Sequence, residues 1–437
     1  MKKIALVGHN LTNLVFALEN QVTQNYEIDF YGFENFRAGH FSGLYDRSFP
    51  FPLDIGMVLF ELETYKDCCS NITEYNEKTI GDSGRFTHKI EKWLVGKGLE
   101  FEESLPIKSV VKNEVYSDFF ITNHFDYFIE KSFQEKYVKD FSRDPKNPSH
   151  PKNKSLWGKK ESPSLRQVSE RTLGNPFTKD FIQSYFNNFD RNIDIENVPA
   201  SLHRSLWAPL LYPETIIDFI KTRDPKINPS RFHIVKNQNT AQSMTQLISK
   251  IDQNSTHINF APQFNQKNAD QYDFVVYGEK PKTEILDKIE KGSLRLIYLS
   301  IDDWEADFQC LNIFQSPSHI FRVSNVGKNK LTTYLCIEQP LHFECNEDDI
   351  IKELREIILG SKPIINVIKK IEAKNSLELP TYKNLMLHEE ASRALTENFK
   401  NYILAGSNSE LGNRSFNDQV ALGLKLFEKL KDSDVYY

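Results

Sequence analysis

The stretch KIALVGHNLTNL, residues 3–14, predicts a buried strand that turns directly into a helix. Where such a turn binds the pyrophosphate of a dinucleotide, it takes glycine at three points: for the tight turn, for the approach of phosphate, and for helix–strand packing. Gly8 supplies the first glycine, whereas Asn10 and Asn13 stand at the other two points. Asn tolerates left-handed backbone angles but still carries a side chain, so the motif is only partly matched.

The residues that follow extend this start into a β-α-β unit. Residues 14–18 continue an apolar helical face, and residues 26–32 predict a second, alternating strand. That strand ends near Glu34, where an acidic residue meets the ribose hydroxyls of a bound dinucleotide. An ordinary β-α-β unit that binds nothing explains the same residues equally well.

Composition narrows the class of protein. The 437 residues suffice for two or three domain-sized units, and 39% hydrophobic with 26% charged residues is typical of a globular protein. The net charge of -6 gives no reason to expect nucleic-acid binding, so a small molecule or a protein is the expected partner. The five cysteines indicate neither a disulfide framework nor a metal site. No apolar run reaches membrane-spanning length, and we expect a cytoplasmic protein.

The rest of the chain alternates between two kinds of pattern. Residues 142–164 are rich in Pro, Lys, Asn and Ser and predict an exposed loop. Strand patterns follow at 257–260, 272–277, 294–299, 320–323 and 332–337, and the later ones predict a largely antiparallel sheet separate from the opening parallel one. The C-terminal part returns to the first pattern, with a short strand ending at Gly406 and a helix from about residue 417 to 430.

Taken in order, these elements resemble the flavoprotein superfamily that contains the monoamine oxidases, protoporphyrinogen oxidase and UDP-galactopyranose mutase. In that superfamily a glycine pair follows the second strand, and Ala38-Gly39-His40 stands there in this chain. An Asp-x-Gly segment comes next and is matched by Asp54-Ile55-Gly56. The closing strand, Ala-Gly pair and helix are similar to Ala405-Gly406 and residues 417–423. Ser407 stands where the superfamily often has a phosphate-facing Arg.

The resemblance implies an α/β fold with a discontinuous Rossmann-like FAD-binding domain and an inserted α+β substrate domain that contains a mostly antiparallel sheet. The implied bounds are 1–62, 232–290 and 398–437 for the FAD-binding domain, and 63–231 and 291–397 for the substrate domain. The implied activity is FAD-dependent oxidation of a small organic molecule by an amine oxidase-like or protoporphyrinogen oxidase-like enzyme. Two alternatives stay open: a non-redox flavoenzyme of the UDP-galactopyranose mutase type, and a flavin-free binding protein of the same fold.

The resemblance also implies the site residues, while no catalytic residue is assigned. The expected FAD-binding residues are Gly8, Asn10, Leu11, Asn13, Glu34, Gly39, His40, Asp54, Gly56, Gly406, Gln419 and Val420. The substrate-side candidates are Met57, Tyr212 and Arg322. For three of these residues a structural role competes: Asp54 as a helix cap, Tyr212 as core, and Arg322 in a surface or structural salt bridge.

Overall fold

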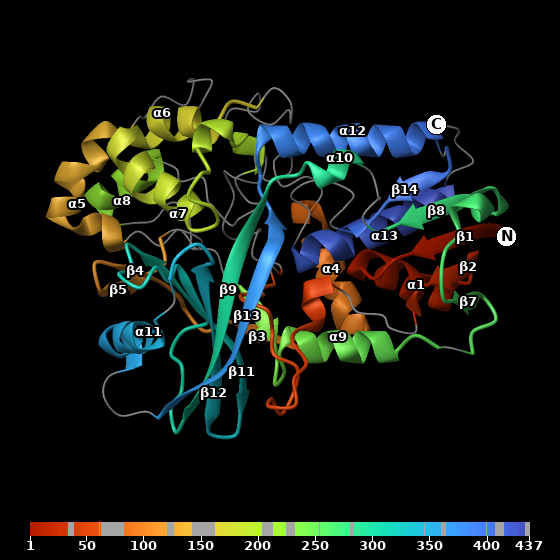
Figure 1. The fold of residues 1–437 in the computed structure, drawn as a ribbon, viewed down its shortest axis with the longest axis horizontal. Coiled ribbons are helices and arrows are strands. Elements are labelled where there is room, and N and C mark those ends of the chain that lie inside the picture. Colours follow the sequence, from red (N-terminus) through yellow and green to blue (C-terminus); the bar gives the residue numbers. More distant parts are fainter. Residues whose placement is uncertain are drawn as a thin grey trace.

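The chain folds around two large β-sheets, shown in the computed structural model of Figure 1. The structure describes residues 1–33, 39–60, 62, 83–119, 126–141, 162–202, 213–223, 232–252, 254–279, 284–344, 346–359, 364–398, 400–406 and 415–432. Residues 142–161 of the predicted loop, together with Glu34, Ala38 and Tyr212, lie outside these residues.

The first sheet has five parallel strands that come from the N-terminal, middle and C-terminal parts of the chain. Its strand order is β14-β8-β1-β2-β7. The strands are β1 (Lys2–Val7), β2 (Tyr26–Tyr31), β7 (Ile258–Ala261), β8 (Phe274–Tyr277) and β14 (Tyr402–Leu404). The last four residues of β1 are all buried, as in a central strand that is covered on both faces.

Helices cover both faces of this sheet. One face packs against α1 (Leu11–Thr23), α4 (Ser83–Gly96), α9 (Thr240–Ser249) and α13 (Phe416–Asp432). The other face packs against α12 (Tyr382–Asn398) and a 3₁₀ turn at Gln266–Gln271. Helices α1 and α13 approach closely at Gly423, where a Cβ would lie 2.7 Å from the Cβ of Val15 and 2.9 Å from the Thr12 carbonyl oxygen.

The second sheet has seven strands in the order β13-β9-β12-β11-β10-β4-β5. Its strands are β4 (Ile107–Val111), β5 (Glu114–Ser117), β9 (Lys291–Asp302), β10 (Cys310–Phe314), β11 (Arg322–Asn329), β12 (Thr332–Pro340) and β13 (Ile365–Glu378). Every pair is antiparallel except β4 with β10, which run parallel, so the expected mostly antiparallel sheet is present. The sequence patterns missed β13, because this edge strand has no fully buried residue and is rich in charged residues.

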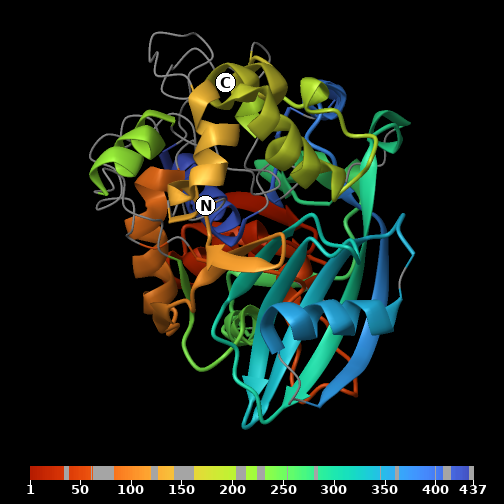
Figure 2. The same cartoon turned by 90° about the vertical axis from the view of Figure 1, so that its left-hand side faces the viewer.

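The remaining elements are a helical lobe, a helix on the second sheet and several short helices, turns and strands. A helical lobe at the upper left of Figure 1 contains α5 (Lys131–Lys136), α6 (Leu165–Phe177), a π-helical turn at Thr178–Gln183, α7 (Ser184–Asn187) and α8 (Pro213–Thr222). Helix α11 (Glu347–Leu354) and the π-helical turn Arg355–Leu359 cover the outer face of the sheet, as Figure 2 shows. Smaller elements are α10 (Glu284–Asp287), the pair β3 (Phe101–Glu103) with β6 (His233–Val235), and 3₁₀ turns at Gly39–Ser42, Asp126–Ile129, Val138–Asp140 and Ile195–Asn197.

None of the helices among the described residues has the length and hydropathy needed to cross a membrane. The joining of β14 to β8, and of β8 to β1, brings distant segments into one sheet. The exact domain bounds stay a prediction.

Candidate functional site

The carboxyl ends of three neighbouring strands bring three glycines to one edge of the parallel sheet. Gly8 follows β1, Gly278 follows β8, and Gly406 comes two residues after β14. The chain leaves β1 toward β2 on one side, whereas β8 lies on the other side, so β1 and β8 flank the point where the strand order reverses. Open α/β sheets bind their ligands outside the carboxyl ends of the strands at this point.

The Asn10 side chain lies among these glycines. A Cβ built on Gly278 would be 1.7 Å from Asn10 Nδ2, and one built on Gly406 would be 2.9 Å from the Cβ and Cγ of Asn10. Asn10 is the N-cap of α1, and its Oδ1 accepts a hydrogen bond from the Asn13 amide at 2.9 Å. Its Nδ2 is buried and has no partner among the described residues. The two glycines therefore provide the space that this carboxamide fills.

Asn13 ties the helix to the strand that precedes it. The residue is fully buried, and its Nδ2 donates to the carbonyl oxygens of Val7 at 2.9 Å and Gly8 at 3.2 Å. Its Oδ1 is buried without a partner in the described part of the chain. The hydrogen-bonded side chain of Asn13 thus occupies the position of the third glycine of the dinucleotide-binding motif, where helix and strand pack most closely.

Two other side chains lie over the neighbouring turns. Gly8 has a φ of 97°, and a Cβ there would lie 2.7 Å from Glu279 Cγ and 2.8 Å from the Glu279 amide nitrogen. Gly32, after β2, has the His9 ring 2.9 Å from its Cβ position. Glycine at position 8 is therefore required by the fold itself, because both the backbone angle and the space exclude a side chain.

The start of α13 lies against the start of α1. The Thr12 hydroxyl donates to the Gln419 carbonyl oxygen at 3.2 Å, and Val420 is fully buried. Ser415 and Asp418 cap the N-terminus of α13 reciprocally. Leu11 is also fully buried, so its backbone amide rather than its side chain is available at the strand-end edge.

Asp54 acts as a helix cap in the structure. Its carboxylate accepts the amides of Thr240 at 3.1 Å and Ala241 at 2.7 Å, at the N-terminus of α9. Burial raises the pKa of Asp54 to about 7, against the opposing effect of these two amides. A role close to a flavin ring stays a prediction for this residue.

Gly56 brings the Asp-x-Gly turn onto the seven-stranded sheet. Its φ is 70°, and a Cβ there would lie 3.2 Å from the Glu338 carboxylate. Glu338 forms an ion pair with Arg322 through both Nε and Nη2, the second bond measuring 2.8 Å. Burial alone would lower the pKa of the Arg322 guanidinium, but the attraction and hydrogen bonds of Glu338 have the larger effect, so the pKa is raised. The Nε and Nη2 donors of Arg322 are thus occupied by Glu338 within the protein. Its Nη1 is buried without a partner in the described residues.

Arg322 and Glu338 belong to a buried polar row that the sequence patterns did not reveal. Ser109, Asn312, Arg322 and Glu338 are direct neighbours across β4, β10, β11 and β12, and none is more than 8% exposed. Besides Arg322 Nη1, Asn312 Oδ1 and Ser324 Oγ are buried without partners within the described ranges. Buried polar atoms are normally hydrogen-bonded, so these three atoms could each form a further hydrogen bond with a ligand.

Three further candidates lie near the Asp-x-Gly turn or in the short turn before it. Met57 is half-buried against the aromatic core of the helical lobe. His40 is exposed and packs on Phe41, with ring centroids 3.9 Å apart. Gly39 has a φ of 60°, and no atom lies within 4 Å of its Cβ position, so its backbone angle rather than space favours glycine there. The described residues contain no group of His, Cys, Asp and Glu that could hold a metal ion.

Similarity to known proteins is found in structure and not in sequence. No protein-family sequence model and no curated protein sequence matches the chain. Reduced UDP-galactopyranose mutase aligns over 98% of this chain and 95% of its own, with a TM-score of 0.67 at 13% identity. A protein from Exiguobacterium sp. 255-15 assigned as a protoporphyrinogen oxidase covers 98% of both chains, with a TM-score of 0.59 at 12% identity. A redesigned putrescine oxidase also covers 98% of both chains, with a TM-score of 0.54 at 10% identity. The chain therefore shares its overall fold with these solved structures of a UDP-galactopyranose mutase, a protein assigned as a protoporphyrinogen oxidase and a putrescine oxidase.

Proposed function

We propose that the chain binds FAD across the carboxyl ends of β1, β8 and β14 and uses it to oxidise a small organic molecule. One observation carries this proposal: the glycines after these strands gather at the N-terminus of α1, beside the buried and unpartnered Nδ2 of Asn10. A helix N-terminus offers amides without intrahelical acceptors, here those of Leu11 and Thr12, and it favours negative charge. This set of donors suits a pyrophosphate.

The residues fit the cofactor once the side chains of Asn10 and Glu279 have turned away from the glycines. The Oδ1 of Asn10 now accepts the Asn13 amide, which is the kind of contact that a phosphate oxygen makes at a helix N-terminus. The carboxamide must turn away from Gly278 and Gly406 before a pyrophosphate can lie there. After this turn, a pyrophosphate oxygen accepts the backbone amide of Asn13 in place of Asn10 Oδ1, and Asn10 Nδ2 can donate to the pyrophosphate.

The buried row on the seven-stranded sheet supports a polar substrate. Its atoms without partners include a guanidinium donor on Arg322, a carbonyl acceptor on Asn312 and the hydroxyl of Ser324. Gly56 contacts Glu338 of the same row, which places the row beside the Asp-x-Gly turn. A bound flavin supplies the redox chemistry as hydride acceptor, while these residues orient the substrate and exclude water.

The test is whether the protein carries flavin. We expect freshly purified protein, or protein incubated with excess FAD and then desalted, to show the visible absorption bands of a flavin. Heat should release the same chromophore into the supernatant. Protein that stays colourless after this incubation would refute the proposal.

A flavin-free binding protein is the second candidate, and the position of Asn10 favours it. The carboxamide fills the space between Gly278 and Gly406, and the acidic side chain of Glu279 lies over Gly8. Neither residue favours a pyrophosphate in this arrangement. The same incubation with excess FAD separates the two functions, because the second predicts protein that stays colourless.

A further inference from the structure

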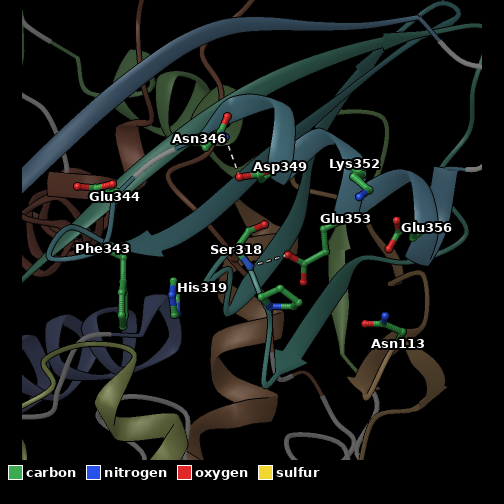
Figure 3. A pocket seen from close by; sticks show the side chains of 11 residues that line it. Asn113, Ser318, His319, Phe343, Glu344, Asn346, Asp349, Lys352, Glu353 and Glu356 are labelled. Carbon is green, nitrogen blue, oxygen red and sulfur yellow. Dashed lines mark hydrogen bonds between the residues drawn. The ribbon is translucent and has the colours of Figure 1, made fainter.

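A cavity of about 660 Å³ lies beside α11, away from the parallel sheet, which is at the opposite end of the molecule in Figure 1. It is lined by α11, the loop before β11, the loop after β12 and the β4–β5 turn (Figure 3). Its lining residues are Asn113, Pro317, Ser318, His319, Phe343, Glu344, Asn346, Asp349, Lys352, Glu353 and Glu356. The volume is that of a site for a small molecule.

The charge of this lining is strongly one-sided. Glu344, Asp349, Glu353 and Glu356 contribute four carboxylates, whereas Lys352 is the one Lys or Arg among the described lining residues. Side chains of one sign around a concave surface raise the local concentration of the opposite charge. The cavity therefore attracts a cation.

Glu353 gives the cavity an unsatisfied carboxylate. The residue is 6% exposed, and its Oε2 accepts hydrogen bonds from Ser316 Oγ at 2.9 Å and the Ser318 amide at 3.0 Å. Its Oε1 is buried with no partner among the described residues, and no cation pairs with the carboxylate there. Figure 3 shows the side chain reaching from α11 toward Ser318, with Asn113 and Glu356 on the opposite side of it. A buried carboxylate that pairs with no cation and has one oxygen without a hydrogen-bond donor is costly unless a donor arrives.

Two flat rings form another part of the wall. His319 and Phe343 stack with centroids 3.6 Å apart and an angle of 5° between their planes. In Figure 3, His319 lies on the side of this pair that faces Ser318 and Glu353. A planar cation stacks on such a ring face, and a guanidinium does so while its edge donates to carboxylates.

We propose that this cavity binds a small guanidinium compound, which stacks on the His319–Phe343 pair and donates to Glu353 Oε1. Because Oε1 is covered in the free chain, binding includes a turn of the carboxylate toward the cavity. The exposed carboxylates of Asp349 and Glu356 accept the remaining donors. This site goes beyond the proposed flavin chemistry and does not depend on it.

Calorimetric titration with butylguanidine tests the proposal, and butylurea serves as an uncharged compound of the same shape. Wild type and Glu347→Gln should bind butylguanidine alike, because Glu347 is on α11 but outside the lining. Glu353→Gln should weaken binding about tenfold or more, the effect of one lost charge-assisted contact. Butylurea should bind far more weakly to all three proteins.

A second variant covers the case in which Glu353→Gln does not fold. Asp349→Asn changes an exposed rim residue and should weaken butylguanidine severalfold while leaving the circular dichroism spectrum unchanged. Binding of butylguanidine that is absent from wild type, equalled by butylurea, or unaffected by the cavity variants would overturn the assignment.

Discussion

Replacing Asn10 with glycine should tighten FAD binding, because it removes the side chain that stands at the expected pyrophosphate position. In the wild-type chain the carboxamide must leave Gly278 and Gly406 and give up its bond to the Asn13 amide before the cofactor binds. An N-cap hydrogen bond of this kind contributes roughly 0.5–2 kcal/mol. Because Asn10→Gly has no such hydrogen bond to break, its Kd for FAD should be lower than that of wild type by about twofold to thirtyfold, with about fivefold as the central expectation. Glycine is itself tolerated at an N-cap, so α1 should stay folded.

Asn10→Asp is the matched control for this experiment. Asp has nearly the same shape and caps a helix as well as Asn does, so the free energy of unfolding should be preserved. Its negative charge, however, would face the pyrophosphate and should abolish binding. Flavin fluorescence titration gives the three Kd values, and urea denaturation checks the fold. Folded Asn10→Gly protein with unchanged or weaker affinity, or Asn10→Asp protein that binds like wild type, would refute the reasoning.

Three further changes test the interior of the fold. Arg322→Met should lower the free energy of unfolding by about 3–5 kcal/mol in urea denaturation, because it leaves the Glu338 carboxylate buried without its ion-pair partner. The double variant with Glu338→Leu should recover most of this stability. An Arg322→Met protein as stable as wild type would contradict this expectation. The pKa of Asp54 is about 7 in the folded protein and 3.8 ordinarily, so between these pH values the native state binds one proton more than the unfolded state. The free energy of unfolding should therefore fall by up to about 4 kcal/mol as pH rises from about 4 to 7, and then level off. Asp54→Asn should remove this pH dependence. Gly423→Ala should lower stability by about 1–3 kcal/mol through its collision with Val15, despite the better helix propensity of alanine, and an unchanged melting temperature would argue against the close helix contact.

The sequence was most informative where periodicity and turn residues agree. The opening strand and helix, the second strand and the closing strand–glycine–helix element all appear close to their predicted places. These elements are buried or amphipathic, so their side-chain pattern reflects the core directly. The resemblance drawn from their order agrees with the fold of the structural neighbours.

The details of the site depend on contacts that no local pattern encodes. Gly278 and Glu279 reach Asn10 and Gly8 because β8 pairs with β1, although more than 260 residues separate them. The direction of the Asn10 carboxamide is likewise set by tertiary neighbours. The Arg322–Glu338 pair depends on the register of β11 and β12, which shifts between Asn325 and Gly327, so the strand patterns alone did not place these two residues opposite each other.

The close contact of α13 with α1 has a consequence for how the protein is made on the ribosome. Phe16 and Tyr26, from the opening β-α-β unit, pack against Phe427 in an aromatic trio that includes residues from both ends of the sequence. During synthesis the opening unit emerges roughly 400 residues before its partner, at about 5–20 residues per second. For that interval, tens of seconds or more, its apolar face lacks its native cover and is open to chaperones and to other nascent chains. Final assembly of the parallel sheet is therefore a late step in the maturation of this protein.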